Sequence, residues 1–277
     1  MNKVWFITGA TRGIGAEIAK AALAVGERVV ATGRKPEAVT RAVGASENLF
    51  VTALDVTHED QIQVSVQAAA ERFGHIDVLV NNAGYGHLGV FEETTPEEIR
   101  AQYDTNVFGL MAVTRAIIPG MRQRRSGRIF NISSVSGLRG IFGGSIYNSS
   151  KVAVEGFSLA LAEELASFGV YVTCVLPGSF RTDFLDPTSV RYSDVDIDDY
   201  ARAWAELRAF HDKHNHAQTG DPARLAAALL HLATIDKPPV WFVAGSDAVE
   251  WATNAIMERQ TELNEWRDLS ISTDGNW

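Results

Sequence analysis

The sequence predicts an α/β fold in which helices cover both faces of a parallel, doubly wound sheet of seven strands. Short, nearly continuous apolar runs recur along the chain, as is typical of parallel strands that are buried on both faces. Longer stretches with helical periodicity separate these runs, and a glycine-rich or polar turn follows several of them. The expected strands are, in chain order, residues 4–7, 28–31, 48–54, 76–80, 128–132, 170–176 and 240–243.

Helices are expected in the stretches between these strands. The segment 60–73, for example, is alanine-rich and places its apolar residues on one helical face. The expected helices are residues 14–25, 60–73, 96–121, 147–167 and 222–234. Right-handed crossovers through such helices bring the carboxyl ends of all strands to one edge, where doubly wound sheets bind their ligands.

Two segments depart from the alternation. Residues 183–220 mix acidic, aromatic and histidine side chains, and a segment of this length after a strand is usually functional. We expect a substrate lid there, and a peripheral helical insertion is the alternative. Residues 247–269 are expected to form a helical extension that packs on the substrate side or on another subunit. The whole chain, 1–277, is expected to be a single domain.

Composition excludes several classes of protein. Hydrophobic residues make up 46% and charged residues 21%, which is typical of globular proteins. The net charge of -9 gives no general attraction to nucleic acid or anionic lipid, and no apolar run reaches the roughly 18 residues of a membrane span. A lone cysteine, Cys174, allows no internal disulfide, and no signal-peptide pattern precedes the first strand. We expect a cytoplasmic protein without nucleic-acid or membrane partners.

A glycine-rich turn follows the first strand. Residues 8–15 read Thr-Gly-Ala-Thr-Arg-Gly-Ile-Gly, with the glycines spaced GxxxGxG. Glycine permits a tight turn and lets backbone N–H groups approach a pyrophosphate at the start of a helix. The turn therefore predicts a dinucleotide site. Its expected cofactor-binding residues are Gly9, Thr11, Arg12, Gly13, Ile14 and Gly15.

The end of the second strand indicates which dinucleotide is bound. An NAD site normally has an acid here for the ribose hydroxyls, but this chain has Gly33 followed by Arg34 and Lys35, with Arg12 in the glycine-rich turn. An acid would repel a 2′-phosphate, whereas a guanidinium pairs with it. We therefore expect NADP(H) rather than NAD(H). The alternative is that Arg34 and Lys35 are ordinary solvated charges.

Asp55 and Val56 follow the third strand and are expected at the adenine end of the site. The Asp55 carboxylate could accept a hydrogen bond from the adenine amino group, cap the following helix, or do both.

Tyr147 and Lys151 lie four residues apart at the start of a predicted helix and therefore on one face of it. A cation near a phenol lowers the phenol pKa from about 10 toward the range useful for general acid–base catalysis. Ser134, at the end of a strand, could hydrogen-bond and polarise a carbonyl group. Asn106 lies within a predicted helix although asparagine is a poor helix former, which indicates a special hydrogen bond.

Together these residues resemble the short-chain dehydrogenase/reductase family, and the resemblance extends from Lys3 to about Val243. The motifs that carry it are the glycine-rich turn 8–15, the Asn-Asn-Ala-Gly of residues 81–84, Asn106, Ser134, Tyr147, Lys151, and Pro177-Gly178. The resemblance implies a Rossmann-type sheet and an NADP(H)-preferring, ketoreductase-like enzyme.

The resemblance also implies the role of each site residue. Tyr147 would be the acid or base, and Ser134 would position the carbonyl. Lys151 would bind the nicotinamide ribose and lower the tyrosine pKa, while Asn106 would hold a water linked to that lysine. The other residues implied to line the cofactor, besides Tyr147 and Lys151, are Asn82, Ala83, Gly84, Pro177, Gly178, Phe180 and Thr182.

The implied activity is that of an NADPH-dependent carbonyl reductase or alcohol dehydrogenase whose small-molecule substrate is a ketone or secondary alcohol. A homodimer or homotetramer is implied, formed through the helices that carry Asn106 and Tyr147. The alternatives are an epimerase, dehydratase or imine reductase that uses the same residues, and a non-catalytic NADP(H)-sensing regulator. No metal is expected: His211, His214 and His216 lie close together in the sequence, but no acid or cysteine beside them completes a site.

Overall fold

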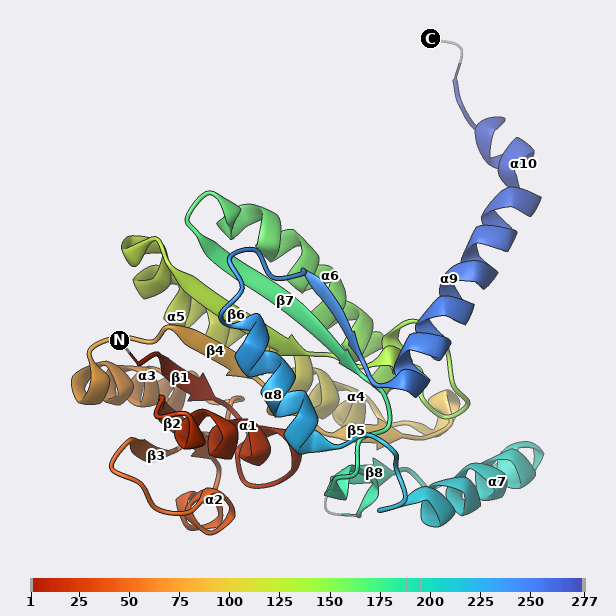
Figure 1. Cartoon of the computed structure of the whole chain (residues 1–277). Helices are drawn as coiled ribbons and strands as arrows, with labels where there is room; N and C mark the ends of the chain where they lie inside the picture. Colours follow the sequence, from red (N-terminus) through yellow and green to blue (C-terminus); the bar gives the residue numbers. More distant parts are fainter. Residues whose placement is uncertain (1, 188, 195, 276–277) are drawn as a thin grey trace.

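Seven parallel strands form the central sheet of the computed structural model, which describes residues 2–187, 189–194 and 196–275 (Figure 1). They are β1 (Val4–Ile7), β2 (Arg28–Gly33), β3 (Leu49–Ala53), β4 (Val78–Asn81), β6 (Gly127–Ile132), β7 (Val170–Pro177) and β9 (Trp241–Ala244). Their order is β3-β2-β1-β4-β6-β7-β9, so the direction of winding reverses between β1 and β4. The predicted doubly wound sheet is therefore confirmed, and its ligand-binding crevice is expected at that reversal.

Helices cover both faces of the sheet. Successive strand residues point to opposite sides, so apolar strands place side chains on both faces that must be buried. On β1, Trp5 and Ile7 belong to one core, and Val4 and Phe6 belong to the other. The first core is covered by α1 (Gly13–Ala24), α2 (Pro36–Val43) and α8 (Pro222–Leu232). The second is covered by α3 (Glu59–Phe73), α5 (Leu110–Arg124) and α6 (Ser145–Ala166). The short helix α2 was not expected, because it buries only Val39.

The single helix predicted for residues 96–121 was wrong in its continuity. The structure divides it into α4 (Pro96–Tyr103), a π-helical turn η2 (Asp104–Gly109) and α5. The Asn106 side chain bonds the backbone of Tyr85, which lies outside this helix. Single π-helical turns are frequent at functional sites. This one interrupts the regular α-helix at Asn106.

A second, two-stranded sheet lies beside the main one. It pairs β5 (Gly86–Leu88) in parallel with β8 (Val190–Tyr192), and the sequence did not predict it because each strand has only three residues. The segment expected as a lid contains η4 (Asp183–Leu185), β8 and α7 (Asp198–His214); its residues 188 and 195 lie outside the described residues. Two short 3-10 turns are η1 (Phe91–Glu93), which follows β5, and η3 (Val135–Gly137), which follows β6.

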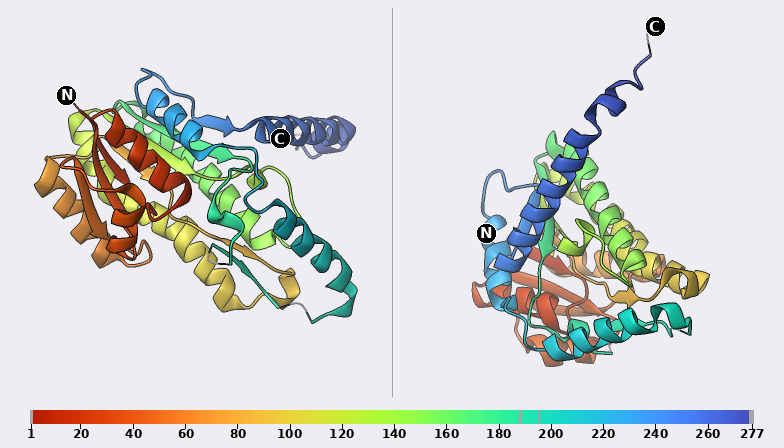
Figure 2. Two further views of the ribbon diagram at one scale, coloured as in Figure 1. Left: turned by 60° about the horizontal axis from the view of Figure 1, so that its bottom comes forward. Right: turned by 90° about the vertical axis from the view of Figure 1, so that its right-hand side faces the viewer.

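The chain ends in two helices, α9 (Ser246–Glu265) and α10 (Arg267–Ile271), which extend away from the sheet (Figures 1 and 2). The first turns of α9 pack on the body through Ala248, Ala252 and Ala255. Among the described residues, no helix is both long and apolar enough to cross a membrane.

Candidate active site

The glycine-rich turn between β1 and α1 leaves its backbone open to a ligand. Gly9 and Gly13 have φ values of 70° and 56°, a region that favours glycine. A Cβ atom on Gly15 would stand 2.5 Å from Asn82 Nδ2 and 2.6 Å from the Gly9 oxygen, so no side chain fits there. No side chain among the described residues caps the start of α1, and its first N–H groups can therefore bind an anion. This cradle fits the pyrophosphate of a dinucleotide.

The polar turn after β4 is fastened to the glycine-rich turn. Thr8 Oγ1 accepts hydrogen bonds from the backbone N–H groups of Asn82 and Ala83, each at 3.0 Å. Asn82 Nδ2 donates to the carbonyl oxygens of Thr8 and Gly9, also at 3.0 Å. The structure thus places the predicted Asn82–Ala83–Gly84 turn beside the cradle, at the reversal of strand order.

The end of β2, where the adenosine is expected, has no room for the acid that is typical of NAD sites. A Cβ on Gly33 would stand 2.6 Å from Thr11 Cγ2 and 3.0 Å from Val39 Cγ2. Arg34, the next residue, is exposed at the end of β2. A glycine followed by an exposed guanidinium suits a ribose that carries a phosphate.

Asp55 forms a turn before α3 with Thr57. Its Oδ1 accepts hydrogen bonds from the Thr57 backbone N–H at 3.0 Å and from Thr57 Oγ1 at 2.8 Å. Burial raises the Asp55 pKa, but these bonds and the positive charges of His58 and Arg34 outweigh burial, so the net pKa is lowered. The carboxylate therefore stabilises this local turn, and Val56 beside it is buried.

Ser134, Tyr147 and Lys151 converge at the carboxyl end of β6. The Tyr147 hydroxyl is hydrogen-bonded to Ser134, whose Oγ also accepts from the Ser136 backbone at 3.1 Å. Lys151 Nζ lies 5.7 Å from the centre of the Tyr147 ring and donates to the Ile132 carbonyl oxygen at 3.0 Å. Ser134 follows β6, whereas Tyr147 and Lys151 belong to α6. The three residues come together because α6 packs on the end of β6.

Burial controls the protonation of this pair. It raises the pKa of Tyr147 to about 12, with the Ser134 hydrogen bond acting in the opposite direction. It lowers the pKa of Lys151 to about 8. Desolvation of the phenolate dominates this site, and the lowering of the tyrosine pKa by Lys151 that the resemblance implies stays a prediction. Tyr147 accordingly keeps its proton at neutral pH.

Asn106 is buried in the π-helical turn and bonded to its surroundings. Its Nδ2 donates to the Tyr85 carbonyl at 3.0 Å and to Ser150 Oγ at 3.3 Å, and its Oδ1 accepts from the Tyr85 N–H at 3.1 Å. Asn106 thus ties the segment after β4 to α6, one turn of which carries Tyr147 and Lys151. The water that the resemblance implies stays a prediction.

The segment expected as a lid covers the phenol. Tyr147 is 7% exposed and packs with Leu88 and Val190 from the small sheet, against which Tyr192 and Trp204 also pack. The Phe184 ring lies 5.8 Å from the Tyr147 ring. Sequence reasoning missed the role of Leu88 and Val190, because β5 reads Gly-His-Leu and β8 reads Val-Arg-Tyr, which are too short and too polar to show a strand pattern.

The segment after β7 meets the glycine-rich turn. The methyl carbon of Thr182 lies 3.4 Å from the position of a Cβ on Gly13. Phe180 forms an isolated parallel bridge with Gly220, and the Ser179 N–H donates to Asp247 Oδ2 at 2.7 Å. A Cβ on Gly178 would stand 2.5 Å from Asp247 Oδ1, so glycine is needed for this approach. Pro177, the last residue of β7, begins this predicted cofactor-side segment.

The C-terminal extension holds the turn that follows Ser134. Arg259 Nη2 on α9 donates to the Leu138 carbonyl at 2.8 Å, and Arg139 forms an ion pair with Glu258 at 3.2 Å. Leu138 is buried with Ala252 and Ala255 of the same helix. Sequence reasoning missed this contact, which joins residues more than a hundred positions apart.

The three histidines of the inserted segment do not converge. His211 Nδ1 lies 2.9 Å from the Tyr192 hydroxyl, and His214 stacks on Phe210. His216 instead forms an ion pair with Asp186 at 3.2 Å, and the ligand atoms of Asp183, Asp186 and His216 lie within 4.8 Å of one another. The expectation that no acid partners these histidines was wrong for His216. The absence of a metal stays a prediction.

Comparison with known proteins agrees with this geometry. The family model described as short chain dehydrogenase matches residues 3–192. The chain is 39% identical over 275 residues to oxidoreductase BOA17 of Botryotinia fuckeliana, covering 99% of this chain and 100% of that one. It is 36% identical over 238 residues to the 3-ketodihydrosphingosine reductase of Bacteroides thetaiotaomicron, covering 86% of each.

Solved structures share the fold. A short-chain dehydrogenase from Streptomyces avermitilis is 39% identical with a TM-score of 0.90, and the match covers 99% of this chain and 100% of that one. The closed form of serine dehydrogenase complexed with NADP+ is 28% identical with a TM-score of 0.73, covering 87% of this chain and 94% of that one. A 3-ketoacyl-(acyl-carrier-protein) reductase from Brucella melitensis, complexed with NADH, has the same identity of 28% and TM-score of 0.73, covering 87% and 96%.

Proposed function

This chain belongs to the short-chain dehydrogenase family of oxidoreductases, and we propose that it is an NADP(H)-dependent carbonyl reductase that interconverts a ketone and a secondary alcohol. The observation that supports this best is the convergence of Ser134, Tyr147 and Lys151 beside the glycine cradle, under an apolar cover. A protonated phenol in an apolar site is suited to donate a proton to a developing alkoxide.

The proposed reduction assigns one task to each side chain. NADPH, when bound, supplies the hydride that the carbonyl carbon accepts. Tyr147 donates its phenolic proton to the carbonyl oxygen, and Ser134 hydrogen-bonds the same oxygen and orients it. Lys151, anchored on the Ile132 carbonyl, favours the phenolate that remains and can return a proton because its own pKa is about 8. In the oxidation, Tyr147 accepts the proton from the alcohol.

The preference for NADP(H) rests on charge and space at the end of β2. Gly33 leaves no room for an acid, and Arg34 and Arg12 supply guanidinium groups that pair with a phosphate. One structural neighbour is complexed with NADP+ and another with NADH, so the choice rests on this chain's own residues.

We propose a single domain in which residues 183–220 act as a substrate lid, because Phe184 and Trp204 from this segment lie at Tyr147.

We also propose a cytoplasmic homodimer or homotetramer joined through η2, α5 and α6. Exposed apolar side chains on these elements support this, namely Phe108 at 57% and Val152 at 50% exposure.

A screen for NADPH oxidation tests the proposed function. Purified protein is mixed with NADPH and with ketones, diketones, sugars or long-chain 3-ketones, the last because one relative is named for such a substrate. Falling absorbance of NADPH with at least one carbonyl compound is expected. If NADPH binds and no carbonyl compound is reduced, the chain is instead a regulator or catalyses a different reaction at the same residues.

A further inference from the structure

A pocket lies beside the small sheet that packs over Tyr147. It has a volume of about 450 Å³, and its polar walls include Tyr85, His87, Glu98, Arg191, Tyr192 and Arg208. His87 and Arg191 are partners in the β5–β8 register, so their side chains share one face of the sheet. Leu88, Val190 and Tyr192 lie on the other face, which packs on Tyr147, and Val190 and Tyr192 also line this pocket. The pocket therefore shares β8 with the cover over Tyr147.

Two arginines give the pocket its chemical character. The Arg191 guanidinium carbon lies 4.8 Å from the centre of the Tyr85 ring, and that of Arg208 lies 3.8 Å from the centre of the Tyr192 ring. Stacking on an aromatic ring fixes the plane of a guanidinium and leaves its N–H edge available to an anion in that plane.

These guanidinium groups have no acidic partner among the described residues. The ion pairs within 4.0 Å involve other arginines, such as Arg139 with Glu258 and Arg202 with Glu206. The Arg208 Nε atom is buried and has no hydrogen-bond acceptor in the part of the chain that the structure describes. Buried donors usually have an acceptor in folded proteins, so this atom is available to an oxygen ligand in the pocket.

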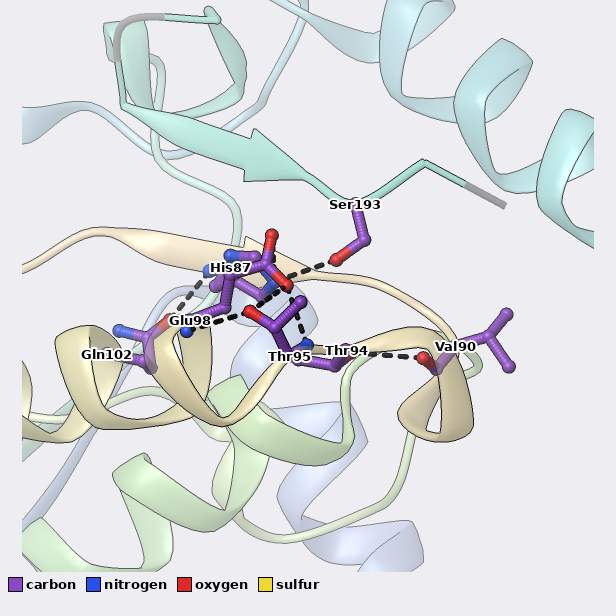
Figure 3. A network of polar contacts seen from close by, with 7 residues as sticks. All are labelled: His87, Val90, Thr94, Thr95, Glu98, Gln102 and Ser193. Carbon is purple, nitrogen blue, oxygen red and sulfur yellow. Dashed lines mark hydrogen bonds and ion pairs between the residues drawn. The ribbon is translucent and has the colours of Figure 1, made fainter. Parts of the chain in front are cut away.

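Glu98, the one carboxylate among the described residues that line the pocket, is already engaged elsewhere. Glu98 Oε2 accepts from the Thr95 N–H at 2.8 Å and from Thr95 Oγ1 at 3.0 Å, which closes the capping box of α4 (Figure 3). Its Oε1 lies 3.8 Å from His87 Nε2. Burial lowers the His87 pKa, so the imidazole is neutral at neutral pH. The two arginines and Glu98 leave the pocket walls with a net positive charge.

The same pocket is linked to the cover over Tyr147. Figure 3 shows Ser193, which follows β8, directed at His87, with Ser193 Oγ 2.9 Å from His87 Nε2. The His87 backbone N–H is held in turn by Gln102 Oε1 at 2.6 Å. Arg191 belongs to β8 and Arg208 to α7, so a ligand that bridges them joins two elements of the cover.

We propose that this pocket binds a small oxyanion, a carboxylate or phosphate group, between Arg191 and Arg208, and that its binding holds β8 and α7 closed over Tyr147. Planar guanidinium groups bind such oxyanions through paired N–H donors. The anion is either part of the substrate or a free ion. The effect on turnover rests on the proposed function, whereas the binding itself does not.

Titration calorimetry with inorganic phosphate tests the binding site, at an ionic strength kept constant with potassium chloride. Arg191→Met and Arg208→Met are each expected to weaken phosphate binding at least tenfold, and the corresponding lysine variants are expected to fall between. Arg202→Met on the same helix is the matched control, because its side chain is 92% exposed and paired with Glu206. Circular dichroism establishes that each variant is folded. Phosphate binding that is absent, or equal in wild type and both methionine variants, overturns the proposal.

Steady-state kinetics distinguish the two sources of the anion. If the substrate supplies it, a carboxylate-bearing ketone has a KM at least tenfold below that of its neutral analogue, and Arg191→Met removes this difference. If a free ion supplies it, added phosphate lowers the KM of the neutral ketone in wild type but not in Arg191→Met. If the enzyme turns over ketones and shows neither of these two KM effects, the proposed coupling between anion binding and the cover is overturned. Phosphate binding without any turnover would instead count against the proposed function.

Discussion

Lys151 holds its Nζ atom 5.7 Å from the centre of the Tyr147 ring while it donates a hydrogen bond to the main chain of β6. The lysine is therefore oriented by the Ile132 carbonyl, at 3.0 Å, and the phenol by Ser134. Both anchors come from the carboxyl end of one strand. A rigid strand thus fixes two side chains of a helix relative to each other, and the following predictions depend on that arrangement.

Replacing Tyr147 with phenylalanine removes the proposed proton donor and keeps the packed ring. We expect kcat for ketone reduction to fall by on the order of 10²–10⁴, because general acid catalysis contributes about that much. NADPH binding, followed by fluorescence titration, is expected to change little. Rates like those of the wild type would contradict the assignment of Tyr147.

Lys151 makes stability depend on pH in a specific window. Burial lowers its pKa from 10.5 to about 8 in the folded chain. Below pH 8 the lysine is protonated in both states, and the penalty for burying its charge is fully present. Between about pH 8 and 10 the unfolded chain binds a proton that the folded chain has released, so the free energy of unfolding rises by up to about 1.4 kcal/mol per pH unit.

Urea unfolding of wild type and Lys151→Met across this pH range measures that contribution. The variant is expected to lack the rise, while other titrating groups affect both proteins alike. The window ends near pH 10 because the lysine of the unfolded chain then loses its proton too, and Tyr147, with its pKa raised to about 12, lowers the stability of the wild type and the variant above that pH. Equal pH slopes in the two proteins would show that Lys151 is not desolvated.

Replacing Arg34 with aspartate tests the cofactor preference. The change removes a guanidinium proposed to pair with the 2′-phosphate and adds a repelling charge, so kcat/KM for NADPH is expected to fall by about 10- to 100-fold relative to NADH. Arg41→Asp makes the same charge change on the exposed side of α2 and is the control. An unchanged ratio of the two cofactors in Arg34→Asp would refute the phosphate contact.

Arg259 connects the C-terminal extension to the turn that follows Ser134, the serine proposed to position the carbonyl. Arg259→Met removes the hydrogen bond to the Leu138 carbonyl, which loosens the turn that positions Ser134. We expect kcat to fall by about tenfold, because small misplacements of catalytic groups are costly, with partial rescue by Arg259→Lys. Arg267→Met on α10 serves as the control. A loss that merely follows a lower Tm, with no rescue by lysine, would indicate a general structural role instead.

The sequence alone determined the sheet, the glycine cradle and the Tyr147–Lys151 pair, because these features depend on local periodicity and spacing. Buried parallel strands are apolar along their length, and residues four apart on a helix face the same way. The oxidoreductase family followed from these local motifs together.

Only the tertiary structure decided how the site is enclosed. The β5–β8 pair joins strands of three residues about a hundred positions apart, and Asn106 enters a π-helical turn because it bonds the backbone of Tyr85. The raised Tyr147 pKa comes from burial under residues such as Leu88 and Val190, and Arg259 reaches Leu138 from the far end of the chain. Burial and long-range hydrogen bonds depend on which elements pack together, and local sequence patterns do not encode that packing.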